Sequence, residues 1–170
     1  VWLDLPTTTE QVQAALRQIG ISSDNPQGLF ISGYFAEEEK RFAIPYNMVL
    51  ASNVDELNFL AARLETLSAG ERAELNAALQ APQSELSSIG KITDFPENVE
   101  YYVYLPDVRG PAQLGDYYLN RSGMVNMPEE WKGGIDTAQF GRYVAQQEQG
   151  AFTQYGYLVK SGDEWQKVHE

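Results

Sequence analysis

Apolar and polar residues recur with a helical period at the start of the chain. Thr7 and Glu10 have the spacing of a capping box, and apolar residues follow every three or four positions until Gly20, so an amphipathic helix is expected there. Residues 29–35 (LFISGYF) are rich in strand formers and predict a strand, and residues 1–5 predict another. The first 48 residues are therefore expected to form a small α+β unit.

The middle of the chain has a purely helical pattern. Ser52 and Ser68 are each followed three positions later by an acidic residue, which predicts the starts of two helices, the second ending near Pro82. A shorter helix is expected around residues 84–92. Strand signals are missing from this segment, so it is predicted to be a helical lobe.

The last segment mixes strand and helix signals. A strand is expected at residues 100–105 (EYYVYL), followed by a helix between Pro111 and Gly123. Another helix is expected to begin after Asp136 and to end at Gly150.

We also expect a terminal hairpin, in which residues 152–159 and 164–168 pair across a turn at residues 161–163. The fold class is therefore α+β. The three segments predict an elongated row of small lobes at residues 1–48, 49–95 and 96–170.

Charge is the most informative property of the composition. The chain has 24 acidic and 12 basic residues, a net charge of −12, and 43% hydrophobic residues, enough for a core. Duplex DNA repels such a protein, so direct nucleic-acid binding is not expected. A run of about 18 apolar residues is missing, which excludes a spanning helix and makes the cytoplasm the expected compartment. Because the sequence starts at Val1 and not at Met, residues are expected to be missing upstream.

The residues needed for most catalytic mechanisms are scarce. The chain has no cysteine, and its single histidine, His169, lies near the end of the sequence, where chains usually fray. Catalytic triads and most zinc sites therefore lack their residues. The sequence also contains no phosphate-binding glycine loop, so neither a cofactor nor a metal is expected. Paired carboxylates such as Glu129 and Glu130 leave a carboxylate-based hydrolase open as an alternative, but the pattern favours a protein that is not an enzyme.

Several stretches of the sequence resemble one protein family. The stretch MPEEWKGGIDTAQFGRYVAQQEQGAFTQYGYL has the family's order of turn and core residues, here Pro128, Ile135, Asp136, Gly141, Arg142, Gly150 and Phe152. QLGDYYLNRSGM, NVDELNFLAARLETL and VWLDLP resemble other parts of the same family, so that the similarity extends over essentially the whole chain. The chain resembles the ArdA antirestriction proteins. Family members usually begin with a further strand and turn before the Trp-containing segment, so the first lobe is expected to lack its first strand.

The resemblance implies a function. ArdA-type proteins are elongated three-lobed α+β molecules, usually homodimers, that bind type I restriction-modification enzymes in place of DNA. They are carried by conjugative transposons and other mobile genetic elements and act in the bacterial cytoplasm. The resemblance implies no cofactor.

The acidic residues provide candidates for the mimicry of DNA phosphates. Carboxylates at positions i and i+3 of a helix lie about 5 to 6 Å apart, comparable with the phosphate spacing of about 3.4 Å along one strand. Glu71 and Glu74 have this spacing. The candidate partner-binding carboxylates are Asp55, Glu56, Glu65, Glu71, Glu74, Glu97, Glu100, Asp107, Asp116, Glu129, Glu130, Asp136 and Glu148. The main alternative function is a protein-interaction module of a mobile genetic element that does not imitate DNA.

Overall fold

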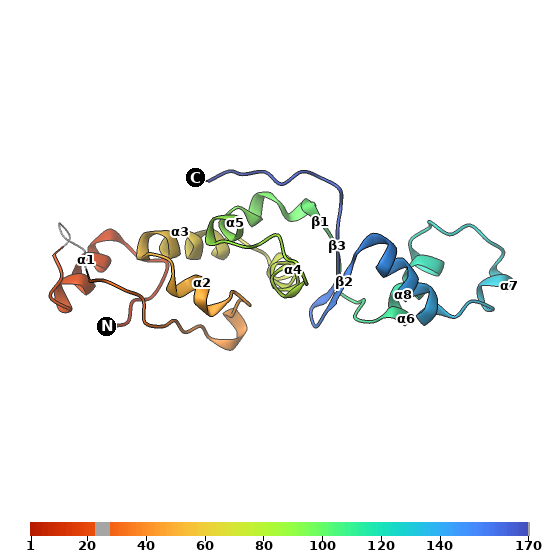
Figure 1. Cartoon of the computed structure of the whole chain (residues 1–170), viewed down its shortest axis with the longest axis horizontal. Helices are drawn as coiled ribbons and strands as arrows, with labels where there is room; N and C mark the ends of the chain where they lie inside the picture. Colours follow the sequence, from red (N-terminus) through yellow and green to blue (C-terminus); the bar gives the residue numbers. More distant parts are fainter. Residues whose placement is uncertain (23–27, 170) are drawn as a thin grey trace.

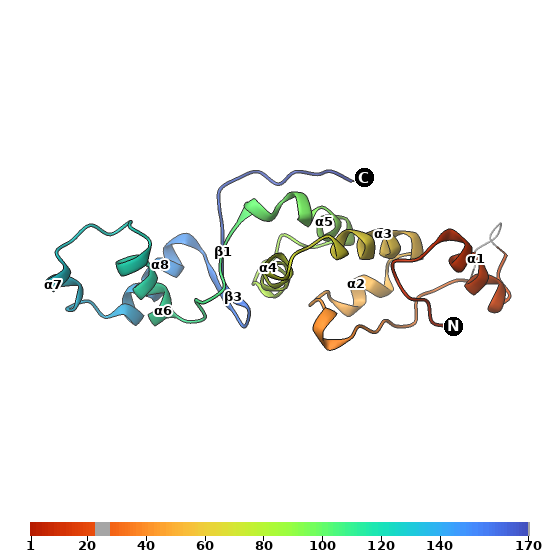
Figure 2. The ribbon, with the colours of Figure 1, turned by 180° about the vertical axis from the view of Figure 1, so that it is seen from behind.

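The fold is a row of helices followed by a small sheet and a second group of helices. The computed structural model describes residues 1–22 and 28–169. Helices α1 to α5 occupy one half of the long axis, the sheet lies near the middle, and α6 to α8 occupy the other half, with α1 and α7 at opposite ends (Figures 1 and 2). The last segment of the chain instead runs back from the sheet over the middle of the molecule.

Short helices make up the first two thirds of the chain, and local capping groups define their starts. Ser68 and Glu71 form the predicted capping box. Thr8, and not Thr7, caps the first helix, because both backbone polar groups of Thr7 are bonded to the side chain of Asn58. The third helix begins one residue later than expected, at a cap formed by Asn53. These helices are α1 (Thr9–Gln18), the 3-10 turn η1 (Glu38–Lys40), α2 (Tyr46–Leu50), α3 (Val54–Glu65), α4 (Ala69–Gln80), α5 (Ile89–Thr93), η2 (Phe95–Glu97) and η3 (Val99–Tyr101).

The two strands predicted for the first lobe are not formed. Residues 1–5 and 29–35 have irregular backbone, and no described residue before position 102 belongs to a strand. Phe30 is 80% and Phe35 75% exposed, so this segment has no buried face. Strand-forming residues need a partner strand to complete the backbone hydrogen bonds. The prediction of an α+β first lobe was therefore wrong.

The part of the chain from residue 102 onward contains the sheet. Its elements are β1 (Tyr102–Leu105), α6 (Pro111–Asp116), the π-helical turn η4 (Tyr117–Arg121), α7 (Glu129–Lys132), α8 (Thr137–Glu148), β2 (Ala151–Thr153) and β3 (Gly156–Lys160). The strand order is β1-β3-β2, all antiparallel, with Tyr102 opposite Lys160 and Phe152 opposite Tyr157. The α+β class is confirmed.

The terminal hairpin lies earlier in the sequence than predicted. β2 and β3 pair directly, and the hydroxyl of Thr153 accepts the backbone N–H groups of Tyr155 and Gly156 to close the turn. Gly156 has φ 146, a value that disfavours residues with a side chain. Residues 164–168 form no strand, because β3 already has β1 and β2 on its two edges.

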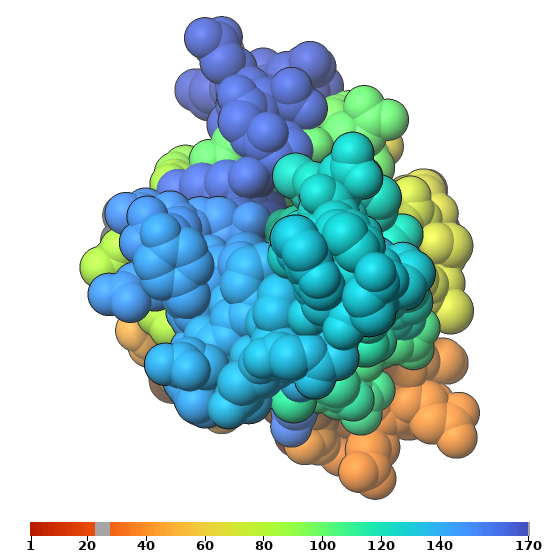
Figure 3. Space-filling view, turned by 90° about the vertical axis from the view of Figure 1, so that its right-hand side faces the viewer, coloured from red at the N-terminus to blue at the C-terminus, as the bar shows by residue number. Residues whose placement is uncertain are grey.

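Two hydrophobic clusters hold these elements together. The first surrounds Leu75, Ile92 and Phe95, and the second surrounds Leu114 and Tyr157, all 0% exposed. Figure 3 looks along the long axis at the end of the molecule built around the second cluster. The boundaries of the three lobes stay a prediction.

Two glycines allow α6 and α8 to pack closely in the second cluster. A Cβ atom on Gly115 would lie 1.9 Å from the carbonyl oxygen of Thr137, and one on Gly141 would lie 1.8 Å from that of Pro111. A side chain at either position would therefore push the two helices apart. Among the described residues, no helix is both long and apolar enough to cross a bilayer.

Candidate functional site

Negative charge is distributed along the whole molecule. Residues 1–48 contain six acidic and three basic side chains, residues 49–95 seven and three, and residues 96–170 eleven and six. The first two segments lie along one half of the long axis and most of the third along the other half (Figure 1), and all three have a net negative charge. An elongated surface of this kind is complementary to a long basic channel.

Six of the candidate carboxylates are exposed, and among the described residues they have no ion-pair partner. Three of them, Asp55, Glu56 and Glu65, lie on α3. The others lie on η3, after β1 and on α7: Glu100, Asp107 and Glu130. These six side chains face solvent, and they extend over the middle and last parts of the molecule.

Three other candidates lie beside basic residues. Glu97 is paired with Arg63. Glu129 lies 2.8 Å from Lys132. Asp116 lies 3.8 Å from Arg121 and also accepts a hydrogen bond of 2.8 Å from the side-chain amide of Asn120. Their charges are partly offset, so they contribute less to a continuous negative surface.

Two of the candidate carboxylates accept backbone hydrogen bonds at the start of a helix. One oxygen of Asp136 accepts the backbone N–H groups of Ala138 and Gln139, both at 3.0 Å. The hydrogen bonds with the Ser68 side chain and backbone lower the pKa of Glu71. Both residues stabilise the start of a helix, where a carboxylate interacts favourably with the helix dipole, and Asp136 is also exposed to solvent.

Glu74 does not behave like a phosphate. Its Oε1 atom is buried without a hydrogen-bond partner among the described residues. Burial, reinforced by the charge of Glu71, raises the pKa of Glu74 to about 7. Near neutral pH a large fraction of Glu74 is therefore protonated, and the pair predicted from the i, i+3 spacing is not a pair of two full charges.

Glu148, the last residue of α8, is hydrogen-bonded to two tyrosine hydroxyls. It accepts a hydrogen bond of 2.8 Å from the hydroxyl of Tyr118 and another from the hydroxyl of Tyr157. Burial, together with this carboxylate, raises the pKa of both tyrosines above its ordinary value. This contact stabilises the second hydrophobic cluster, so Glu148 is poorly placed to meet a partner.

The acidic loop at residues 37–39 is a further negative surface outside the candidate set. All three of its glutamates are exposed, and among the described residues only Glu37 has a basic partner, Lys40 at 3.4 Å. The run of three glutamates was visible in the sequence. The loop lies in the first segment of the chain, which contains none of the candidate carboxylates.

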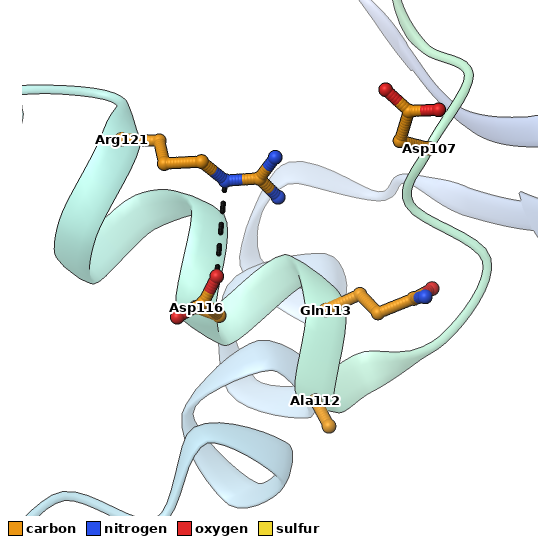
Figure 4. Close-up of a pocket in the computed structure, with 5 residues that line it drawn as sticks. All are labelled: Asp107, Ala112, Gln113, Asp116 and Arg121. Carbon is orange, nitrogen blue, oxygen red and sulfur yellow. Dashed lines mark ion pairs between the residues drawn. The ribbon is translucent and has the colours of Figure 1, made fainter.

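A shallow hollow lies between α6, η4 and the loop after β1. It is lined by Asp107, Ala112, Gln113, Asp116 and Arg121 (Figure 4). Asp116 and Arg121 face each other across one side of it, and the side-chain oxygen of Gln113 accepts the backbone N–H of Arg109 at 2.7 Å. Charges of both signs line the hollow. Within residues 1–22 and 28–169, no three acidic or histidine side chains converge as metal ligands would.

Comparison with known proteins places this acidic molecule in a family. The family model described as antirestriction protein (ArdA) matches residues 1–159, which include α1 to α8 and nearly all of the sheet. A search of curated proteins finds no match to the chain. The family consists of inhibitor proteins and not of enzymes. The resemblance found in the sequence is therefore confirmed, and the chain belongs to the ArdA family of antirestriction proteins.

Proposed function

We propose that this antirestriction protein is a DNA mimic that inhibits type I restriction-modification enzymes by occupying their DNA-binding groove. The observation that supports this most directly is that six exposed carboxylates, without an ion-pair partner among the described residues, are spread over the middle and last parts of an elongated molecule. A groove that binds DNA must be basic to neutralise phosphates. The same groove attracts any rigid body of similar length that presents negative charge along one axis.

The amount of charge limits what mimicry alone provides. A net charge of −12 equals the phosphates of only about six base pairs. The ion pairs and the protonation of Glu74 reduce the effective charge further. We therefore assign to the carboxylates mainly the rate and orientation of the encounter. Exposed aromatic residues near the α7 end, such as Trp131 at 66% and Tyr143 at 60%, provide contact area for a partner or a second copy.

The oligomeric state, cellular compartment and genetic origin of the protein are proposed from its family. We infer that the protein acts as a homodimer in the cytoplasm of a bacterium, and that a mobile genetic element such as a conjugative transposon carries it. The mechanism needs no cofactor, because binding alone excludes DNA from the groove.

Displacement of DNA tests this proposal. A labelled duplex is bound to a purified type I enzyme, and the protein is added in increasing amounts while the bound duplex is measured on a gel. We expect complete displacement. A variant with Asp55→Asn, Glu56→Gln and Glu65→Gln on α3 should need about tenfold more protein, since an exposed charge pair contributes roughly 0.5 kcal/mol.

A matched variant separates charge placement from total charge. Neutralising Glu37, Glu38 and Glu39 to glutamine changes the net charge by the same amount at a different place. We expect this variant to lose clearly less activity than the α3 variant. Equal losses would contradict the role of placement, and retention of all the DNA at saturating protein would contradict mimicry and favour a protein-interaction module that does not imitate DNA.

A further inference from the structure

The segment after β3 is attached to the helical part of the molecule by its own set of contacts. We call residues 161–169 the return segment. It leaves the sheet and runs back beside α5 and α3 (Figures 1 and 2). The return starts at Ser161, whose backbone N–H and hydroxyl both donate to the carbonyl oxygen of Tyr101, at 2.9 and 3.0 Å.

A buried asparagine binds the backbone of the return segment as a partner strand would. Asn98 is only 4% exposed. Its side-chain oxygen accepts the backbone N–H of Gln166 at 2.7 Å, and its side-chain nitrogen donates to the carbonyl oxygen of the same residue at 2.8 Å. One amide side chain therefore satisfies both backbone groups of one residue. Such recognition depends on an extended backbone and not on the side chain of the residue that is bound.

A buried carboxylate binds the end of the same segment. Asp94 is 2% exposed, and its Oδ1 atom accepts the backbone N–H of His169 at 3.0 Å. The ring Nδ1 of His169 lies 2.7 Å from the same oxygen, and the ring packs edge-on against Phe59 at 5.0 Å between centroids. The prediction that this part of the chain frays was wrong, because backbone, ring and carboxylate contacts hold His169.

An aromatic contact lies between these two polar contacts and the sheet. Trp165 packs edge-on against Tyr101, with ring centroids 5.2 Å apart, and joins the first hydrophobic cluster. Among the described residues its indole N–H has no hydrogen-bond partner, so packing fixes its position. Phe59, Asp94, Asn98 and Tyr101 together form what we call the docking face.

The two buried polar side chains of the docking face, Asp94 and Asn98, form hydrogen bonds with the return segment. Among the described residues, the side chain of Asp94 hydrogen-bonds only with His169, and that of Asn98 only with Gln166 and with the backbone of Asp94. A buried carboxylate or amide without partners is costly. The docking face lies within the residues that the family model matches, whereas the return segment begins after residue 159, where that match ends.

We propose that the docking face is a peptide-binding site, and that the return segment occupies it as an intramolecular ligand. The ligand class is an extended peptide with an aromatic residue followed four positions later by a histidine, as in Trp165 and His169. Binding in cis ties the sheet to the helical part and covers two buried polar side chains. The proposal does not depend on DNA mimicry.

A peptide titration tests this site. A synthetic peptide of residues 161–169, capped at both ends and labelled, is titrated into a chain that ends at Lys160 and into the full chain, with fluorescence anisotropy as the readout. We expect one-to-one binding to the shortened chain. Binding to the full chain should be at least about tenfold weaker, because the tethered segment competes at high effective concentration.

Variants of the peptide test the contacts without affecting the fold of the protein. Trp165→Ala or His169→Ala in the peptide should each weaken binding about tenfold or more, whereas Lys167→Ala, at an exposed position, should have little effect. Equal affinity of all peptides, or no binding to the shortened chain, would overturn the proposal.

Hydrogen exchange in the full chain gives an independent test that needs no truncation. The amides of Gln166 and His169, which donate to buried side chains, should exchange at least about tenfold more slowly than that of Lys167. An Asn98→Ala variant should speed exchange at Gln166. Unprotected amides at both positions would show that the segment is not bound and would contradict the proposal.

Discussion

Glu74 provides a sharp test of the electrostatics, because its environment disfavours the charge that the sequence implies. It lies on α4 beside the sheet, where burial raises the pKa of Tyr102 and Tyr104 and the charge of Glu74 adds to the effect. Its Oε1 atom is buried without a partner among the described residues, and burial together with Glu71 raises its pKa to about 7. Replacing Glu74 with glutamine keeps the shape and removes the charge. We expect Glu74→Gln to stabilise the protein at alkaline pH.

The direction and the size of the effect follow from linkage. The folded protein holds the proton of Glu74 more tightly than the unfolded chain, in which the pKa is near 4.5. Below that pH the group is protonated in both states and has no effect on the pH dependence. Between about pH 4.5 and about pH 7 the unfolded chain releases this proton while the folded protein still holds it. The free energy of unfolding therefore falls as pH rises through this range. The full shift corresponds to roughly 3 kcal/mol, and partial access to water reduces this to about 1 to 2 kcal/mol.

Urea denaturation at a series of pH values measures this effect. We expect Glu74→Gln to exceed the wild type by about 1 to 2 kcal/mol in the free energy of unfolding at pH 8, and by nothing at pH 4. Glu65→Gln is the matched control, because Glu65 is exposed and unpaired within the described part of the chain. Its difference from the wild type should not depend on pH in this way. Equal stability of Glu74→Gln and wild type at pH 8 would refute the reasoning.

Three further predictions concern packing and capping. Gly141→Ala should destabilise the protein by about 3 kcal/mol or more, because its Cβ would lie 1.8 Å from a backbone oxygen of α6. The measurement is the melting temperature, which should fall; an unchanged value would contradict the close contact between α6 and α8. Tyr157→Phe should cost about 1 to 3 kcal/mol in denaturant unfolding, because Glu148 loses a part-buried hydrogen bond. No loss of stability would contradict a stabilising role for this bond. Ser68→Ala should cost about 1 kcal/mol in the same assay, because it removes one side of the capping box, and a neutral result would argue against that cap.

The parts of the fold that depend on nearby residues were predictable from the sequence. The capping box at Ser68 needs only residues three positions apart, so it was placed correctly. The helix that follows Asp136 was predicted for the same reason. The cap of α1 was shifted by one residue because Asn58, some fifty positions away, binds Thr7. Capping patterns therefore identify helices reliably, while distant contacts decide which of two neighbouring residues caps them.

The strands show where local pattern is insufficient. Residues 29–35 have the composition of a strand, but they pair with no strand among the residues that the structure describes. Residues 164–168 lose their predicted pairing because both edges of β3 are occupied. A strand depends on a partner distant in sequence, which the pattern of one segment does not contain.

The candidate site was predictable as a set of residue types but not as a surface. The sequence identifies the carboxylates, and it does not show that Arg63 pairs with Glu97, thirty-four positions away. Nor does it show that Glu74 is partly buried or that two tyrosines bind Glu148. In the sequence, Glu74, Glu97 and Glu148 are no different as candidates from Asp55, which is exposed and unpaired among the described residues. Tertiary contacts therefore decide which of them present a full charge to a partner.

Mutual exclusion is the most direct test of the central claim that this ArdA protein and DNA occupy the same groove. The affinity of the labelled protein for a purified type I enzyme is measured at increasing concentrations of an unlabelled duplex that contains the recognition sequence. We predict that the apparent dissociation constant rises in proportion to the duplex concentration without reaching a plateau. A plateau would show that enzyme, DNA and protein form a ternary complex, and it would contradict the account.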